Sequence, residues 1–231
     1  MLSFAGKNIL VVGATGAFGG EFCAQMNVAG ATVIGTASSN ASSVRLPTSL
    51  SQRLLLNLED AQSIQALTAY LNSLPGAIDG IVLAAGLVAF GSVAETPVAV
   101  TERLMKVNVL GQISLVQQLL PKLQESAAAG REPFVLSISG VISESPMQGL
   151  ASYSASKTAL HGFATAAAKE FRKLGIAWVD ARPGHTESGL AGRAIFGAAP
   201  NFGDGKNVPD VIARMLYGLT VGEKDLPSTV F

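Results

Sequence analysis

Apolar and polar positions along the chain alternate between two kinds of segment. Short, almost continuous apolar runs bounded by turn residues alternate with longer stretches in which apolar residues recur at helical spacing. The apolar runs are Asn8–Val12, Thr32–Gly35, Leu54–Leu58, Gly80–Ala85, Phe134–Ile138 and Ile176–Ala181. The helix-like stretches are Ala17–Ala29, Asp60–Leu74, Pro97–Gln124 and Ser152–Leu174.

This alternation predicts the fold class. Strands that are apolar on both faces are typical of parallel sheets covered by helices on both sides, and strand–helix alternation builds right-handed βαβ units. We therefore expect an α/β fold, a Rossmann-type doubly wound parallel sheet flanked by helices on both faces. The 231 residues contain no linker or repeat, so we expect a single domain over residues 1–231. A Gly- and Ala-rich loop over residues 188–207 has the length of a lid over a substrate site.

Composition and charge exclude several classes of protein. Hydrophobic residues make up 48% of the chain and charged residues 14%, which predicts a substantial core and excludes a disordered chain. Sixteen basic residues balance sixteen acidic ones, so there is no electrostatic footprint for nucleic acid or a membrane surface. We find no secretory leader and no run that approaches the roughly 20 apolar residues of a membrane span. We expect a cytoplasmic protein with no metal site, because its two His and one Cys are dispersed.

A glycine-rich turn follows the first apolar run, where residues 13–20 read GATGAFGG. Small residues let backbone N–H groups approach a pyrophosphate, and the N-terminus of the next helix then faces that anion. The alternative interpretation is an ordinary tight turn, but the position between a strand and a helix favours a dinucleotide site. The turn residues expected to contact the dinucleotide are Gly13, Thr15, Gly16, Phe18 and Gly19.

The second apolar run indicates which dinucleotide binds. NAD usually meets an acidic residue about 20 residues after the glycine turn, and no Asp or Glu occurs between Glu21 and Glu59. A carboxylate there would repel a 2′-phosphate, so its absence favours NADP (NADPH) over NAD. We expect the hydroxyls of Ser38 and Ser39 to accommodate the phosphate, the alternative being a plain surface loop.

Tyr153 and Lys157 are four residues apart in the last helix-like stretch, so their side chains share one helix face. A phenol with a pKa of about 10 is a poor proton relay at neutral pH, and an adjacent ammonium stabilises the phenolate. We therefore expect Lys157 to lower the pKa of Tyr153 and the pair to act in proton transfer.

Further motifs follow in order between Lys7 and Leu190. They are Ala84-Ala85-Gly86, Asn108-Val109, Ser137-Ile138-Ser139 and Pro183-Gly184. With the glycine turn and the Tyr–Lys pair, this constellation resembles the short-chain dehydrogenase/reductase family, and residues 30–37 are also similar to bacterial 3-oxoacyl-carrier-protein reductases. The resemblance implies an NADP-dependent oxidoreductase that moves a hydride between the nicotinamide and a carbonyl or secondary alcohol. It also implies a small-molecule substrate, which the apolar loop suggests is apolar, and a homodimer or homotetramer.

The resemblance assigns roles to individual residues. Tyr153 is the general acid or base, Lys157 binds the nicotinamide ribose, and Asn108 anchors a water-linked proton relay. The resemblance also implies further cofactor contacts. Asn57 and Leu58 are expected beside the adenine, and Ala84, Ala85 and Gly86 beneath the adenosine ribose. The contacts expected at the nicotinamide are Pro183, Gly184, Thr186 and Ser188.

The chain departs from the family pattern at its catalytic serine, because Gly140 stands at the usual position thirteen residues before the tyrosine. One residue along a strand turns a side chain to the opposite face. Either Ser139 supplies the hydroxyl or the donor is missing, and we favour Ser139. The chain also lacks the family's glycine-rich final strand. The alternative function is a dinucleotide-binding sensor or scaffold with little or no turnover, and a non-redox enzyme on the same fold is a third.

Overall fold

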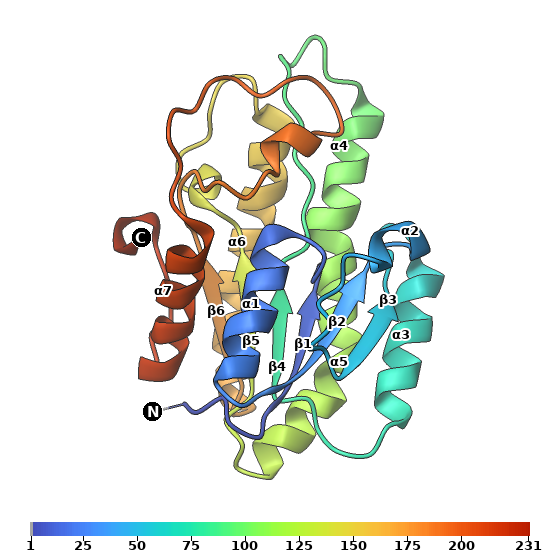
Figure 1. The fold of residues 1–231 in the computed structure, drawn as a ribbon. Coiled ribbons are helices and arrows are strands. Elements are labelled where there is room, and N and C mark those ends of the chain that lie inside the picture. Colours follow the sequence, from blue (N-terminus) through green and yellow to red (C-terminus); the bar gives the residue numbers. More distant parts are fainter. Residues whose placement is uncertain (1) are drawn as a thin grey trace.

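The computed structural model describes residues 2–231 and forms a six-stranded parallel sheet (Figure 1). The strand order is β3-β2-β1-β4-β5-β6, so the order reverses between β1 and β4. The strands are β1 (Asn8–Val12), β2 (Thr32–Ala37), β3 (Gln52–Leu55), β4 (Gly80–Leu83), β5 (Phe134–Ile138) and β6 (Ala177–Ala181). This is the doubly wound parallel sheet that the apolar runs predict.

Helices cover both faces of the sheet (Figure 1). The α-helices are α1 (Ala17–Val28), α2 (Asn40–Ser43), α3 (Ala61–Ser73), α4 (Val98–Met105), α5 (Gly111–Ala128), α6 (Ala151–Lys173) and α7 (Val208–Val221). Helices α1 and α7 pack on one face, and α3, α5 and α6 pack on the other. Short helical turns are η2 (Val141–Ser143), η3 (Ala191–Arg193) and η4 (Ser228–Val230).

The first strand shows why the apolar runs are continuous. Ile9 and Val11 point into the core under α1 and α7, whereas Leu10 and Val12 point into the core under α3, α5 and α6. All four side chains are fully buried or nearly so. A strand in the middle of such a sheet has no solvent face, so it shows no alternation of polar and apolar residues.

Two of the differences between predicted and observed elements concern internal geometry and register. The stretch Pro97–Gln124 is helical from Val98 onwards, as predicted, but the π-helical segment η1 (Lys106–Leu110) lies within it, between α4 and α5. The third strand is Gln52–Leu55 rather than Leu54–Leu58. It pairs with β2 only as far as Ala37, where β2 ends, and the chain then leaves the sheet.

The segment after α7 approaches β6 without forming a seventh strand. Leu226 makes an isolated parallel bridge to Ala181, with hydrogen bonds to the backbones of Asp180 and Arg182. The tail therefore reaches the carboxyl end of β6. Within residues 2–231, every helix is too short or too polar to cross a membrane.

Candidate active site

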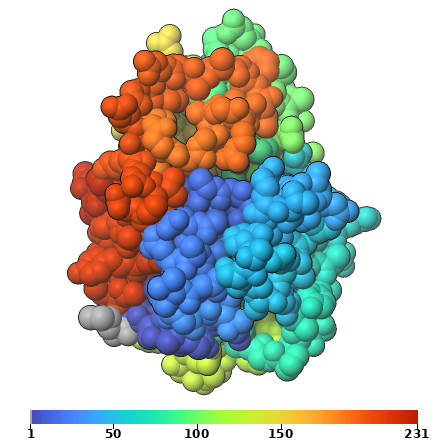
Figure 2. All heavy atoms as spheres, viewed as in Figure 1, coloured from blue at the N-terminus to red at the C-terminus, as the bar shows by residue number. Residues whose placement is uncertain are grey.

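A cavity of about 500 Å³ lies at the carboxyl ends of the strands, the edge at which open α/β sheets bind ligands. In Figure 2 the orange surface of the loop after β6 lies above the blue surface around helix α1. Most of the residues expected to bind a cofactor line this cavity. They are Gly13, Thr15, Gly16, Phe18, Ser38, Asn57, Leu58, Ala84, Ala85, Gly86, Tyr153, Lys157, Pro183, Gly184, Thr186 and Ser188.

The glycine turn packs so tightly that only glycine fits. Gly13 has a φ of +83°, and a Cβ there would lie 2.8 Å from the Ala85 Cα. Gly19 does not line the cavity; it lies behind Gly13, where a Cβ would come within 2.2 Å of the Gly13 carbonyl oxygen. Helix α1 begins after Gly16 with no side-chain cap, so the N–H groups of its first turn are left for an anion. This cradle fits a dinucleotide pyrophosphate.

The adenosine end differs in part from the prediction. Ser38 lines the cavity, whereas the Ser39 hydroxyl caps α2 by accepting a hydrogen bond from the Ser42 N–H at 3.2 Å. Arg103, on α4, also lines this end and forms an ion pair with Glu59 at 2.9 Å. Sequence reasoning missed this pair, because its members lie 44 positions apart and belong to no motif.

Tyr153 and Lys157 lie together on α6, as their spacing predicts. The Lys157 Nζ is 5.9 Å from the centroid of the Tyr153 ring and donates a hydrogen bond to the Ile138 carbonyl oxygen at 2.8 Å. The predicted direction of the Tyr153 shift is wrong, however, because burial raises the pKa of this phenol to about 12. Burial also lowers the pKa of Lys157 to about 8, against the opposing effect of Asp180. Burial alone accounts for the shift of the Tyr153 pKa, and Tyr153 makes no contribution to the shift of the Lys157 pKa.

Asn108 lies behind the pair rather than on the cavity wall. Its fully buried amide exchanges two hydrogen bonds with the Leu87 backbone, at 2.8 and 2.9 Å, and donates to the Ser156 hydroxyl at 3.0 Å. A Cβ on Gly86 would lie 3.5 Å from the Asn108 Oδ1 and 3.6 Å from the Lys157 Nζ. Asn108 therefore holds the segment after β4 beside Lys157, and its role in a proton relay stays a prediction.

Ser139 lines the cavity through its position at the end of β5, but its side chain is fully buried. The hydroxyl donates to the Asp180 Oδ2 at 2.5 Å and accepts from the Ser143 hydroxyl at 3.1 Å. A hydroxyl has one proton to donate, and here the carboxylate takes it. This geometry differs from the donor role expected of Ser139. Gly140, with a φ of +76°, supplies no hydroxyl in its place.

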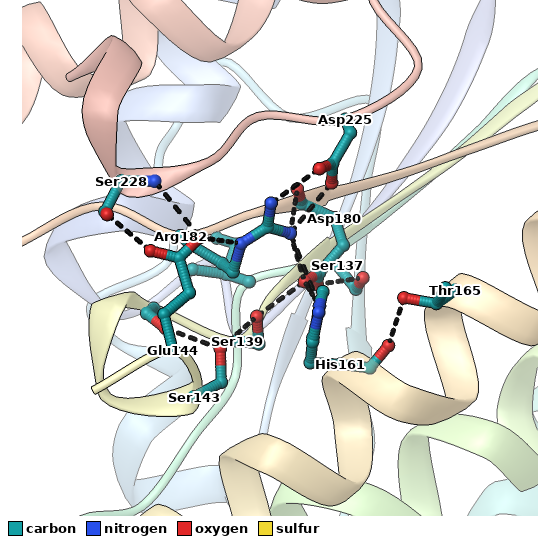
Figure 3. A network of polar contacts seen from close by, with 12 residues as sticks. Ser137, Ser139, Ser143, Glu144, His161, Thr165, Asp180, Arg182, Asp225 and Ser228 are labelled. Carbon is teal, nitrogen blue, oxygen red and sulfur yellow. Dashed lines mark hydrogen bonds and ion pairs between the residues drawn. The ribbon is translucent and has the colours of Figure 1, made fainter. Parts of the chain in front are cut away.

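Behind Ser139 lies a cluster of charged side chains around the buried Arg182 and Asp180, which we call the Arg182 cluster (Figure 3). Arg182 is 3% exposed and contacts three carboxylates, those of Glu144, Asp180 and Asp225. The hydrogen bonds that the guanidinium donates to Asp225 raise its pKa, in spite of burial. Burial raises the pKa of Glu144, but hydrogen bonds from Ser228 and Arg182 outweigh it and lower the pKa overall. The cluster joins the tail, β6 and the turn after β5.

An apolar chamber adjoins the tyrosine. Its buried residues are Val88, Phe90, Ile142 and Leu150, and Tyr153, Leu190 and Phe202 pack against them. His185 and Arg193 line the same cavity. This end of the cavity is suited to an apolar group next to a proton donor. Groups of three or more potential metal ligands are absent from the described residues, 2–231.

The fold and the site together define a class: a Rossmann-type oxidoreductase with a dinucleotide cradle and a Tyr–Lys pair. Residues 7–195 match the short chain dehydrogenase family. The chain belongs to this family and is an NAD(P)-dependent short-chain dehydrogenase/reductase.

Two curated relatives illustrate the range of similarity. A dehydrogenase/reductase SDR family protein 7-like from Anopheles gambiae is 27% identical, with 96% of this chain and 74% of the relative covered. A rhamnolipids biosynthesis 3-oxoacyl-[acyl-carrier-protein] reductase from Pseudomonas aeruginosa is 33% identical, over 73% of this chain and 68% of the relative. The second similarity agrees with the resemblance noted in residues 30–37.

Solved structures share the fold. A 3-ketoacyl-(acyl-carrier-protein) reductase from Brucella melitensis, complexed with NADH, superposes with a TM-score of 0.86 at 21% identity, over 97% of both chains. A short chain dehydrogenase from Burkholderia cenocepacia, in complex with NADP, superposes with a TM-score of 0.83 at 16% identity, over 99% of this chain and 90% of the other. These two complexes hold different dinucleotides, so the preference of this chain depends on its own residues.

Proposed function

We propose that the protein is an NADPH-dependent reductase of a carbonyl group on a small, largely apolar substrate. The observation that carries the proposal is the placement of Tyr153 and Lys157 in one cavity with the glycine cradle and the apolar chamber. A bound nicotinamide dinucleotide supplies hydride transfer chemistry. The residues of this chain bind it, exclude water and transfer the proton.

The state of Tyr153 suits the reductive direction. A phenol whose pKa is about 12 is protonated at neutral pH and can donate to an oxygen that develops alkoxide character, which is far more basic. The reverse reaction needs a phenolate, whose formation burial disfavours. We therefore infer that Tyr153 acts as the general acid, and that Lys157 holds the ribose hydroxyls through its ammonium.

The preference for NADPH rests on the adenosine end of the cavity. Ser38 and Thr36 line this end, and they bring no carboxylate against a 2′-phosphate. Glu59, the acidic residue of the lining, is paired with Arg103. Arg103 is half exposed, so its guanidinium has further donors free for a phosphate.

The test is an assay of NADPH consumption with a panel of carbonyl compounds, repeated with NADH. Tyr153→Phe should lower kcat by about 10²–10⁴-fold while NADPH still binds, because the variant lacks only the acidic proton. Ser139→Ala is the matched control and should lower kcat less than about tenfold, because its hydroxyl serves Asp180.

Three outcomes contradict the proposal. Parent-level turnover in Tyr153→Phe would eliminate the proton-transfer mechanism. A clear preference for NADH would refute the assignment of the dinucleotide. Saturable NADPH binding without turnover of any carbonyl compound would favour the sensor or scaffold, to which the missing serine hydroxyl also points.

A further inference from the structure

The substrate end of the cavity contains a histidine that the proton transfer does not use. His185 follows Pro183-Gly184 and lines the cavity. Its ring lies against that of Phe202, with centroids 5.1 Å apart, and Phe202 packs against the same apolar chamber as Tyr153. His185 is therefore at the reacting end of the cavity, away from the adenosine end.

Contacts on two sides fix the imidazole. Its Nε2 lies 3.4 Å from the Glu187 Oε1, and that oxygen also accepts a hydrogen bond from the Gly205 N–H at 2.8 Å. A Cβ at Gly205 would lie 2.9 Å from the His185 Cδ2, so glycine is needed for this close approach. With Nε2 facing Glu187, Nδ1 is the ring nitrogen left for a ligand. The group is held in place before any ligand binds.

The charges near His185 favour an anionic ligand. Arg193 belongs to the same loop, lines the cavity and is held by a hydrogen bond to the Ser188 carbonyl oxygen at 3.3 Å. The one acidic side chain among the cavity-lining residues is Glu59, which is paired at the other end. The reacting end therefore offers two basic side chains on the cavity wall, while the nearest carboxylate, that of Glu187, lies outside the lining and faces the His185 Nε2.

The hydrogen-bond donors that follow β5 on the cavity wall already have partners within the protein, so a substrate oxygen would need a further donor such as His185. The Ser139 proton is donated to Asp180, and the N–H groups of Gly140 and Val141 are donated to the Ala181 and Pro183 carbonyl oxygens, at 3.2 and 2.9 Å. Tyr153 provides the proton for the carbonyl oxygen. A second oxygen of the substrate has to find its partner elsewhere on the wall.

We propose that His185, positioned by Glu187 and Phe202 and assisted by Arg193, binds a carboxylate or similar anionic oxygen group that the substrate carries near its carbonyl. The substrate class is then an oxo acid whose apolar remainder lies in the chamber beside Phe90. This inference rests on the proposed reductase function and adds to it a residue that determines specificity.

The experiment compares oxo acids with their own methyl esters, with the carboxylate one, two or three carbons from the carbonyl. We measure kcat/KM with NADPH, and the equilibrium binding of each compound to the NADP⁺-saturated protein. At least one acid should be favoured over its ester by about tenfold or more, the scale of one charge-assisted hydrogen bond. His185→Phe should reduce that ratio to near one, and Glu187→Gln should reduce it in part.

Each outcome decides the matter. The inference is overturned if the wild type shows no acid preference, or if the ratio survives in His185→Phe. It is also overturned if His185→Phe weakens NADPH binding instead, since the anion recognised would then be the cofactor phosphate. Absence of all turnover, with the acid preference still present in the binding data, would refute the reductase but retain the anion site. Glu170→Gln, on an exposed part of α6, is the control and should keep the ratio.

Discussion

The two ends of the cavity are built in different ways. The cofactor cradle is made of backbone: Gly13, Gly19 and Ala85 approach so closely that any side chain would collide. The reacting end is made of side chains, with Tyr153 at its wall and the Arg182 cluster behind it (Figure 3). Here the chain departs from the family pattern, with Gly140 at the position of the usual serine.

This difference separates binding from chemistry. A backbone cradle requires only small residues, so it holds a dinucleotide regardless of what reacts beside it. Side chains determine which proton moves and which substrate enters. Changes at the two ends should therefore have separable effects, one on cofactor affinity and the other on turnover and stability.

The largest effect is expected at the reacting end. Arg182→Leu removes the partner of Glu144, Asp180 and Asp225 and leaves the buried Asp180 carboxylate without its guanidinium. The free energy of unfolding should fall by about 3–5 kcal/mol, measured by urea denaturation, and kcat should fall while the Kd of NADPH stays within about twofold. Arg172→Leu, at an exposed site on α6, is the control and should change stability by less than about 0.5 kcal/mol. A large loss of NADPH affinity in Arg182→Leu would show that the two ends are not separable.

The opposite pattern is expected at the cradle. Gly19→Ala places a methyl group 2.2 Å from the Gly13 carbonyl oxygen, so the turn must shift. We expect a loss of about 1–3 kcal/mol in stability and of about tenfold or more in NADPH affinity, measured by fluorescence titration. Gly20→Ala, one residue along α1, meets nothing closer than 3.7 Å and should gain about 0.5–1 kcal/mol. Equal behaviour of the two variants would refute the close-packing argument.

The smallest effect concerns the pH dependence of stability. The pKa of Lys157 is about 8 in the folded protein and 10.5 in its ordinary state. Below pH 8 the native state holds Lys157 as a buried ammonium, which lowers the free energy of unfolding. Between pH 8 and pH 10 the native state releases this proton, whereas Lys157 in the unfolded chain stays protonated. Stability relative to Lys157→Met should therefore rise between about pH 8 and pH 10, by about 1–2 kcal/mol. If the difference in unfolding free energy between the wild type and Lys157→Met did not change across this range, the lowered pKa would be contradicted. Lys173→Met, at an exposed site, is the control.

The fold was predictable where one local pattern determines it. Strands β1 and β5 have the predicted bounds, because each apolar run is a strand buried on both faces. The π-helical segment around Asn108 was not predictable, because one added residue in a helical turn shifts the apolar periodicity by a single position, which is within its ordinary irregularity. The bounds of β3 depend on where β2 ends, which is a property of the assembled sheet.

The site shows the same division. The glycine turn and the Tyr–Lys pair are short-range motifs that the sequence shows directly, and the roles of the pair came from the family resemblance. The raised pKa of Tyr153 was missed, because desolvation depends on the chamber that assembles around it. Arg182 and Asp225 were missed because an ion pair between distant positions has no local signature, even though Arg182 directly precedes Pro183-Gly184.

The hydrogen bond from Ser228 to Glu144 joins positions 84 residues apart along the chain. Closing so long a loop is entropically expensive and slow, whereas the glycine turn needs β1, α1 and contacts with Thr36 and Ala85, all of which precede the tail along the chain. During folding, the half of the cavity that holds the dinucleotide should therefore form before the half that reacts. A newly made chain should thus capture its cofactor first and acquire turnover only when the tail has docked.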